Sequence, residues 1–427
     1  MRSREQITGY AKSGVVRIAA IGSQFVLIGM ISRYLGVVST GQYANTISIA
    51  SIVAIVVTYG QMAAVIKELP EKVNRNDVNG MSNVIARSFY IVLVCSVVLL
   101  LPIIGLSFLG TGTVAGAVLA SGLGVGLGLL AVNGAVARSY GAIFISESAK
   151  AVIWRLAAIA CLGMAALFGV QITINHVLLV VLAVMLLSVV VTVAVLQKKY
   201  KLSLINTQGR IRFSDVRVDT LNWFLQSLQT LLLNVDVVLV GALIGLQEAG
   251  IYFVLTRMAS LVSMPLSVTN PVIQPMLGRI AKTQSVIAGN RSIKVNARAN
   301  IAAALVISLV MIVFSKFVYN ALTGEELTSD MVIVFFLLLF SQLVNCCVGP
   351  TSFSTQLFNV RKQALQILLI CLLGMVVCIV LFSGSHGIFG VAATVCFWRV
   401  LQNAWTFILV WKKGGLNLIT GSYRVLV

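Results

Sequence analysis

Charged residues are scarce in this chain. Only 10% of its 427 residues are charged, with 12 acids against 31 Lys and Arg, whereas 59% are hydrophobic. An ordinary soluble domain carries about 25% charged residues, because its surface faces water. Apolar runs such as Val84–Phe108 and Leu178–Leu196 reach the ~18 residues that a transmembrane helix needs. The composition therefore excludes a soluble protein and predicts an all-α, polytopic membrane bundle.

Other chemically active features are also missing. The two histidines are far apart in sequence, and the seven cysteines all fall inside apolar runs without metal-ligand spacing. We therefore expect no metal site and no disulfide framework. A Walker motif is absent, so neither direct ATP driving nor any other cofactor is predicted. Because the external loops are mostly a few residues long and the cytoplasmic loops lack clustered carboxylates, a membrane glycosyltransferase or glycan polymerase is disfavoured, and the chain is predicted not to be an enzyme.

The apolar runs predict twelve transmembrane spans. Their expected limits are residues 15–33, 41–66, 84–108, 112–136, 151–169, 173–196, 219–245, 250–277, 299–322, 331–352, 363–383 and 387–411. Three of the six prolines, Pro265, Pro271 and Pro275, fall in the eighth span, where they predict kinks.

The basic residues are distributed unevenly between the two sides of the bundle. Most of the 31 Lys and Arg fall in the termini and in alternate loops, whereas the opposite loops are very short and nearly free of them. Since cytoplasmic loops carry the Lys and Arg excess, both termini are predicted to be cytoplasmic, in the bacterial inner membrane. The net charge of +19 is then a topology signal and not a nucleic-acid surface. The basic loops are expected to contact anionic membrane lipids.

A short pattern occurs twice, about half a chain apart. Gly36, Gly41 and Tyr43 recur with the same spacing as Gly245, Gly250 and Tyr252. Each copy lies at the external end of the first helical hairpin of its half. The repeat predicts two pseudo-symmetric lobes of six helices, related by an axis along the membrane normal. Their predicted limits are 1–200 for the N-terminal lobe, 201–218 for a cytoplasmic linker and 219–427 for the C-terminal lobe.

Both hairpins also resemble a known family. Arg33-Tyr34-Leu35-Gly36, followed by Gly41-Gln42-Tyr43, is similar to the first-hairpin signature of polysaccharide-biosynthesis membrane proteins, the Wzx-type O-antigen flippases. The segment from Asp236 to Arg257 resembles the start of their second half. These proteins belong to the multidrug/oligosaccharidyl-lipid/polysaccharide exporter superfamily.

The resemblance implies a bundle of two lobes around a central cavity. It implies a flippase for undecaprenyl-diphosphate-linked oligosaccharides, which would move by alternating access from the cytoplasmic to the periplasmic leaflet. The delivered units would be polymerised into O-antigen, capsule or exopolysaccharide, which implies a polymerase partner. A cation-coupled small-molecule or multidrug antiporter of the same superfamily is the alternative.

Charges inside the spans are the candidate functional residues. A charge in hydrocarbon costs at least ~2.5 kcal/mol on insertion scales, so such residues usually face a cavity or a partner. The candidates for contact with a lipid-linked sugar are Arg257, Arg399, Arg155, Lys316 and Arg33, together with the polar residues Gln24 and Asn345. For the cations near span ends, snorkelling towards the head groups is the alternative.

Asp236 is the one acid well inside a predicted span. It lies on the helix before that of Arg257, at a similar depth when both are counted from the turn between them, which predicts an ion pair. That pair could lock two helices, or it could open during transport. In the second interpretation Arg257 contacts the diphosphate, and Asp236 binds a coupling proton or sodium ion. The excess of bases over acids favours an anionic cargo over cationic drugs.

Overall fold

The computed structural model describes residues 2–106, 114–200, 219–270, 287–358, 360–414, 417 and 419. Regular structure in these ranges is helical throughout. Ten of the described helices are long and apolar enough to cross a membrane. The predicted all-α, multi-pass membrane architecture is therefore confirmed.

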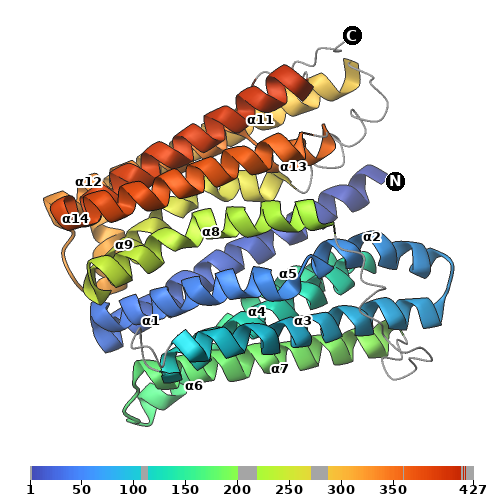
Figure 1. Ribbon diagram of the computed structural model, residues 1–427, viewed down its shortest axis with the longest axis horizontal. Helices are drawn as coiled ribbons and strands as arrows, with labels where there is room; N and C mark the ends of the chain where they lie inside the picture. The colour runs from blue at the N-terminus through green and yellow to red at the C-terminus, as the bar shows by residue number, and fades with distance from the viewer. Residues whose placement is uncertain are drawn as a thin grey trace. The chain divides into compact units, whose positions relative to one another are not determined.

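Two of the ten helices contain a sharp bend. Helix α1 (Arg2–Thr58) bends at Gly36, with φ 83° and ψ 171°, and helix α14 (Arg361–Gly414) bends at Gly387, with φ 54° and ψ −143°. The apolar part of α1 has 45 residues, which as a straight helix would span about twice the ~30 Å hydrocarbon layer. Figure 1 shows each helix doubling back on itself. Each bent helix covers two predicted spans, which is how twelve predicted spans correspond to ten helices.

The second predicted span, 41–66, ends too late. The helix stops at Thr58, because Tyr59 and Gly60 take positive φ values of 41° and 72°. Helix α2 (Gln61–Asn74) then runs through much of the loop predicted at 67–83 and buries Gln61, Ala64, Val65 and Leu69. Hydropathy missed this break between two helices because the sequence stays apolar across Tyr59 and Gly60.

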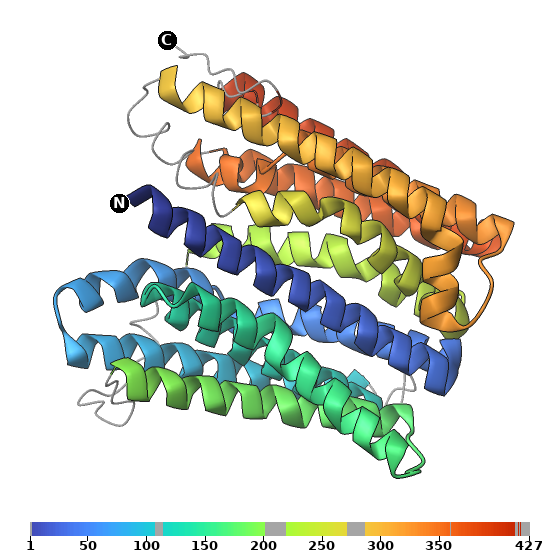
Figure 2. The same cartoon turned by 180° about the vertical axis from the view of Figure 1, so that it is seen from behind.

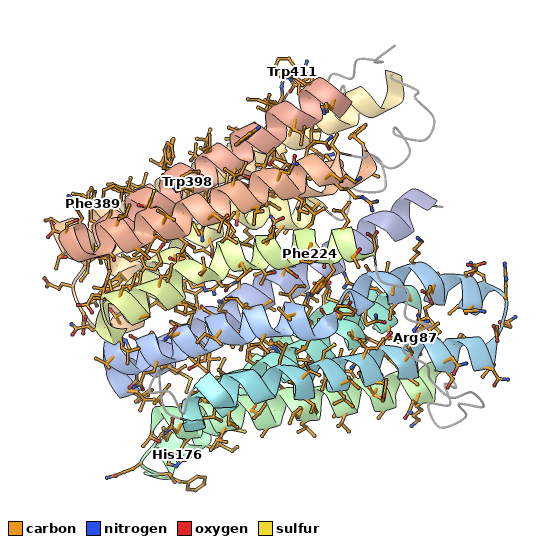
Figure 3. All side chains as sticks on the ribbon, in the orientation of Figure 1. Arg87, His176, Phe224, Phe389, Trp398 and Trp411 are labelled. Carbon is orange, nitrogen blue, oxygen red and sulfur yellow. The ribbon has the colours of Figure 1, made fainter. Side chains whose placement is uncertain are left out.

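Polar contacts fasten α2 to α3 (Val78–Leu106). Asp77 precedes α3, where its carboxylate accepts hydrogen bonds from the Gly80 amide (2.8 Å) and from the Lys72 ammonium (2.9 Å). The Lys72 hydrogen bond holds the pKa of Asp77 below its ordinary value. Arg87 of α3, labelled in Figure 3, forms a 2.7 Å ion pair with Glu68 of α2. Arg87 thus has a structural partner at the end of its span.

The first of two compact units comprises Met1–Leu35 and Gln42–Thr230. Besides α1, α2 and α3 it contains α4 (Val114–Ser139), α5 (Ile143–Ser148), the π-helical turn η2 (Ala149–Ile153), α6 (Trp154–Leu167) and α7 (Ile174–Tyr200). One hydrophobic cluster of this unit joins α2, α3, α4 and α7, and it includes Val65, Ile85, Val136 and Leu196. Trp223, at the start of α8 (Thr220–Leu243), also belongs to this unit and donates to the Ile55 carbonyl (3.1 Å).

The second unit comprises Gly36–Gly41 and Leu231–Val427. Its helices are most of α8, then α9 (Leu246–Ser260), α11 (Ile287–Thr323), α12 (Ser329–Val348), α13 (Thr351–Leu357) and α14. Helix α12 packs against α9, α11 and α14. Figure 2 shows α11, in yellow to orange, running the length of this unit.

Two predictions fall partly outside the described residues. The prolines of the eighth span predicted kinks, and a 3₁₀ turn, η4 (Leu261–Ser263), does follow α9 just before Pro265. Pro271 and Pro275 lie outside the described residues, as does the predicted linker 201–218. The unit boundary falls within α8, after Thr230, and the lobe limits 1–200 and 219–427 stay a prediction.

Candidate functional site

A buried ion pair joins α8 to the second arm of α14. The Nη2 of Arg399 lies 2.9 Å from the Oδ2 of Asp236, and the two side chains are 6% and 0% exposed. The same Nη2 donates to the Leu232 carbonyl, one turn before Asp236 on α8 (3.3 Å). Arg399 and Asp236 are 163 residues apart in sequence, so the pair fixes the C-terminal helix against the start of the second half.

Tyr252 of α9 completes the cluster. Its hydroxyl donates to the Oδ2 of Asp236 over 2.9 Å, so two donors meet on one carboxylate oxygen. The other oxygen, Oδ1, is buried and has no hydrogen-bond partner in the part of the chain that the structure describes, and the same holds for the Nε of Arg399. The ion pair is therefore not the two-bond, fork-to-carboxylate form in which arginine binds acids most strongly.

Burial of these two charges is costly in free energy. Removing both charges from water costs several kcal/mol per ion, and one contact recovers only part of that free energy. A well-packed apolar pair would give similar or better stability at such a position. Intramembrane charges are therefore functional candidates by default, and this pair is the strongest one among the described residues.

The sequence had predicted an ion pair between Asp236 and Arg257, and that prediction is wrong. The ion pair of Asp236 is with Arg399, while the guanidinium of Arg257 lies 4.6 Å from the ring centroid of Phe253, one turn earlier on α9. This is a cation–π distance. Counting residues from the turn placed Arg257 at the right depth, but depth does not determine the direction in which a side chain leaves its helix.

The other predicted site residues have different surroundings in each unit. In the first unit, Arg155 of α6 donates to the carbonyl of Ala151 (2.5 Å), and its guanidinium lies 4.7 Å from the ring centroid of Trp154. Arg33 is exposed and Gln24 is half-buried. In the second unit, Asn345 is half-buried and Lys316 is exposed. The neighbours of Lys316 on α11, Val313 and Phe317, are 66% and 72% exposed, as expected for a membrane-facing surface.

The two copies of the repeat meet within the second unit. A Cβ added to Gly41 would overlap the Leu246 carbonyl oxygen, and one added to Gly250 would overlap the Val37 carbonyl oxygen. The two equivalent glycines thus let two backbones approach each other. The halves differ beside this contact: Tyr43 and Tyr252 are both buried, but Leu27 holds the place in the first copy that Asp236 holds in the second.

An apolar cavity of about 290 Å³ lies in the first unit, where the turn after α6 meets the first arm of α1. Its lining includes Met30, Tyr34, Leu162 and Val177. None of the predicted site residues lines it, and its wall carries no charged side chain. It therefore does not suit an anionic head group.

Sequence reasoning identified Asp236 and Arg399 singly but not as partners, and it left Tyr252 out of the site. Tyr252 carried one available signal, because it is the repeated tyrosine of the second half and follows Asp236 across a short turn. The partnership of Arg399 had no such signal, because nothing local links α14 to α8.

Solved structures show the same fold. An inward-facing multidrug resistance MATE family transporter of the MOP superfamily matches with a TM-score of 0.66 at 14% identity, over 93% of this chain and 97% of that one. The lipid II flippase MurJ in an inward closed conformation matches with a TM-score of 0.61 at 12% identity, over 95% and 87%. The MATE multidrug transporter DinF-BH, solved in a complex, matches with a TM-score of 0.61 at 15% identity, over 96% of both chains.

None of the curated proteins compared with the chain matches it. A family model described as "Polysaccharide biosynthesis protein" matches residues 11–281, which is more than half of the chain and includes both repeat hairpins. This confirms the resemblance seen in the hairpin sequences. The solved structures of this fold named above are of two multidrug transporters and a lipid II flippase. The chain therefore belongs to the polysaccharide biosynthesis protein family.

Proposed function

We propose that the chain is a flippase for undecaprenyl-diphosphate-linked oligosaccharide repeat units. It carries them from the cytoplasmic to the periplasmic leaflet of the bacterial inner membrane by alternating access, for O-antigen, capsule or exopolysaccharide synthesis. Family membership supports the link to polysaccharides, and the fold, which a lipid II flippase shares, suits a lipid-linked cargo. The observation that carries the proposal is the buried, single-contact ion pair between Arg399 and Asp236.

Arg399 is the proposed contact for the diphosphate. The planar guanidinium can donate two parallel hydrogen bonds to a phosphate group, whereas in the pair with Asp236 its Nε has no partner in the described region. A diphosphate offers more negative charge and more acceptor oxygens than one carboxylate. The substrate can therefore displace Asp236 from Arg399.

Asp236 is the proposed coupling group. When Arg399 turns to the substrate, the carboxylate stays fully buried and loses its counter-charge. An isolated buried anion is strongly unfavourable, so Asp236 must then take up a proton or a sodium ion. Binding of the anionic cargo to Arg399 and uptake of the cation by Asp236 are thereby linked, because each event requires the ion pair to open.

The remaining predicted residues have supporting roles in this proposal. Arg257, Arg155 and Arg33 would give the diphosphate or an acidic sugar further positive charge, and Gln24 and Asn345 would bind sugar hydroxyls. Lys316, on an exposed face of α11, would instead extend towards the head groups. Both termini are cytoplasmic, the basic loops contact anionic membrane lipids, and a polymerase is the partner that receives the sugar. No nucleic acid, cofactor or metal is involved.

A cation-coupled small-molecule antiporter is the second candidate. It is favoured by the fold shared with multidrug transporters. Cationic drugs need acids in their path, and within the described spans Asp236 is paired with an arginine. This balance of charge supports the anionic cargo.

A translocation assay separates the two candidates. We expect liposomes containing the purified protein to expose a lipid-linked repeat unit, extracted from a polymerase-deficient strain, to an external glycosidase at least ten times faster than protein-free liposomes. At equal amounts of folded protein, the variant Asp236→Asn should lose at least nine-tenths of this rate, because its side chain no longer takes up a cation. Drug-driven proton or sodium exchange without sugar translocation would establish the antiporter instead.

A further inference from the structure

Tyr252 is the third member of the buried cluster, and the exchange proposed above does not yet use it. Its hydroxyl and the Nη2 of Arg399 both donate to the Oδ2 of Asp236, each over 2.9 Å. Asp236, Tyr252 and Arg399 lie on three different helices, α8, α9 and α14. Tyr252 is fully buried and is a neutral donor. Its hydroxyl therefore does not compete with a substrate's phosphate for Arg399, as the Asp236 carboxylate does.

We infer that Tyr252 is a positioning residue, which holds the Asp236 carboxylate when Arg399 leaves it and so sets how readily Arg399 binds a diphosphate. The inference rests on the proposed function. With Tyr252 present, Asp236 keeps one hydrogen bond after Arg399 has turned to the substrate. Without that hydroxyl, the described residues offer the carboxylate no hydrogen-bond donor besides Arg399. Arg399 would then be bound more tightly by Asp236 and would be less available to the substrate.

The local structure keeps Tyr252 in place during such an exchange. Residues 249–255 of α9 are all buried. Two residues before Tyr252, Gly250 lies against the backbone of Val37 and Gly41, which anchors the start of α9. The hydroxyl therefore stays directed at Asp236 whether or not Arg399 is bound there.

The first copy of the repeat supplies a matched control. Tyr43 occupies the position equivalent to Tyr252 and is almost as buried, at 4% against 0% exposure. Leu27 stands in the first copy in place of Asp236, so that copy has no carboxylate at the equivalent sequence position. Tyr43→Phe and Tyr252→Phe each remove one hydroxyl from a buried ring, but only the second removes a donor to Asp236.

The test is the affinity of the full-length protein in detergent for inorganic pyrophosphate, the diphosphate alone. Binding can be followed by calorimetry or by the fluorescence of Trp398, next to Arg399 in sequence and labelled in Figure 3. We expect Tyr252→Phe to weaken binding about tenfold, the effect of losing a hydrogen bond to a charged group. Tyr43→Phe should stay within about twofold of the original protein, the scatter expected away from the site. Asp236→Asn, which frees Arg399, should bind more tightly.

A double variant distinguishes positioning from a general structural role. If Tyr252 acts through Asp236, then Asp236→Asn with Tyr252→Phe should bind pyrophosphate as tightly as Asp236→Asn alone. A tenfold loss that persists in the Asp236→Asn background, or equal affinities for Tyr252→Phe and Tyr43→Phe, would overturn the inference. If the original protein does not bind pyrophosphate, or if Arg399→Gln leaves binding unchanged, the proposed function itself fails.

Discussion

Replacing Arg399 by glutamine is expected to destabilise the protein by about 3–5 kcal/mol and to abolish transport. The two effects have different causes. Transport fails because Arg399 is the proposed contact for the diphosphate, and stability falls because Asp236 is fully buried and its only charged partner in the described structure is Arg399. Removing one member of a buried pair leaves an uncompensated charge, which costs about this much free energy. Unfolding of the purified protein in detergent measures the first effect, and the liposome translocation assay measures the second.

The double variant Asp236→Asn with Arg399→Gln separates stability from function. It replaces both charged groups by neutral amides and leaves no uncompensated charge, so most of the lost stability should return, whereas transport should not. Arg75→Gln is the matched control, because Arg75 pairs with Glu71 at side-chain exposures of 68% and 63%. Such exposed pairs contribute about 0–1 kcal/mol. Transport at the original rate by the double variant would show that the pair only locks two helices.

The fold was largely predictable because membrane spans are governed by composition. Apolar length and the distribution of Lys and Arg depend on residues that are neighbours in sequence, so they locate spans without three-dimensional information. The predicted span limits are wrong where the chain changes direction or structure without a change in hydropathy. The helix is interrupted at Tyr59 and Gly60 without any break in hydropathy, so the sequence divided α2 between a predicted span and a predicted loop.

The candidate site was less predictable, because its contacts join distant segments. Sequence reasoning found Asp236 and Arg399 as buried charges, since a charge is conspicuous in an apolar span. It then gave Asp236 the wrong partner, because the nearest basic residue on the next helix was Arg257. The rotation of each helix about its own axis decides the pairing, and this rotation follows from packing against all neighbouring helices. The repeat was more informative, because its glycines and tyrosines mark positions where backbone approach and burial constrain the residue type.

The second large effect that we expect is a loss of stability when Gly250 is replaced by alanine. Gly250 lies inside α9 with ordinary helical geometry, so alanine at an uncrowded position of this kind would stabilise the helix by about 0.5–1 kcal/mol. Here the new Cβ would overlap the carbonyl oxygen of Val37, which is backbone and has little freedom to shift. Forcing an extra methyl group into a closed contact costs about 1–3 kcal/mol, and more where backbone must move.

The chain provides controls of the opposite sign at Gly22 and Gly163, where an added Cβ meets no atom within 4 Å. Gly22→Ala and Gly163→Ala should raise the melting temperature slightly, whereas Gly250→Ala and Gly41→Ala should lower it by several degrees, the shift that about 1–3 kcal/mol produces. A cysteine placed at Ser39, between the two glycines Gly36 and Gly41, should also react faster with a maleimide in the Gly250→Ala background. If Gly250→Ala proves as stable as Gly22→Ala, the two hairpins do not touch, and the anchoring of Tyr252 beside Asp236 must come from other contacts of α9.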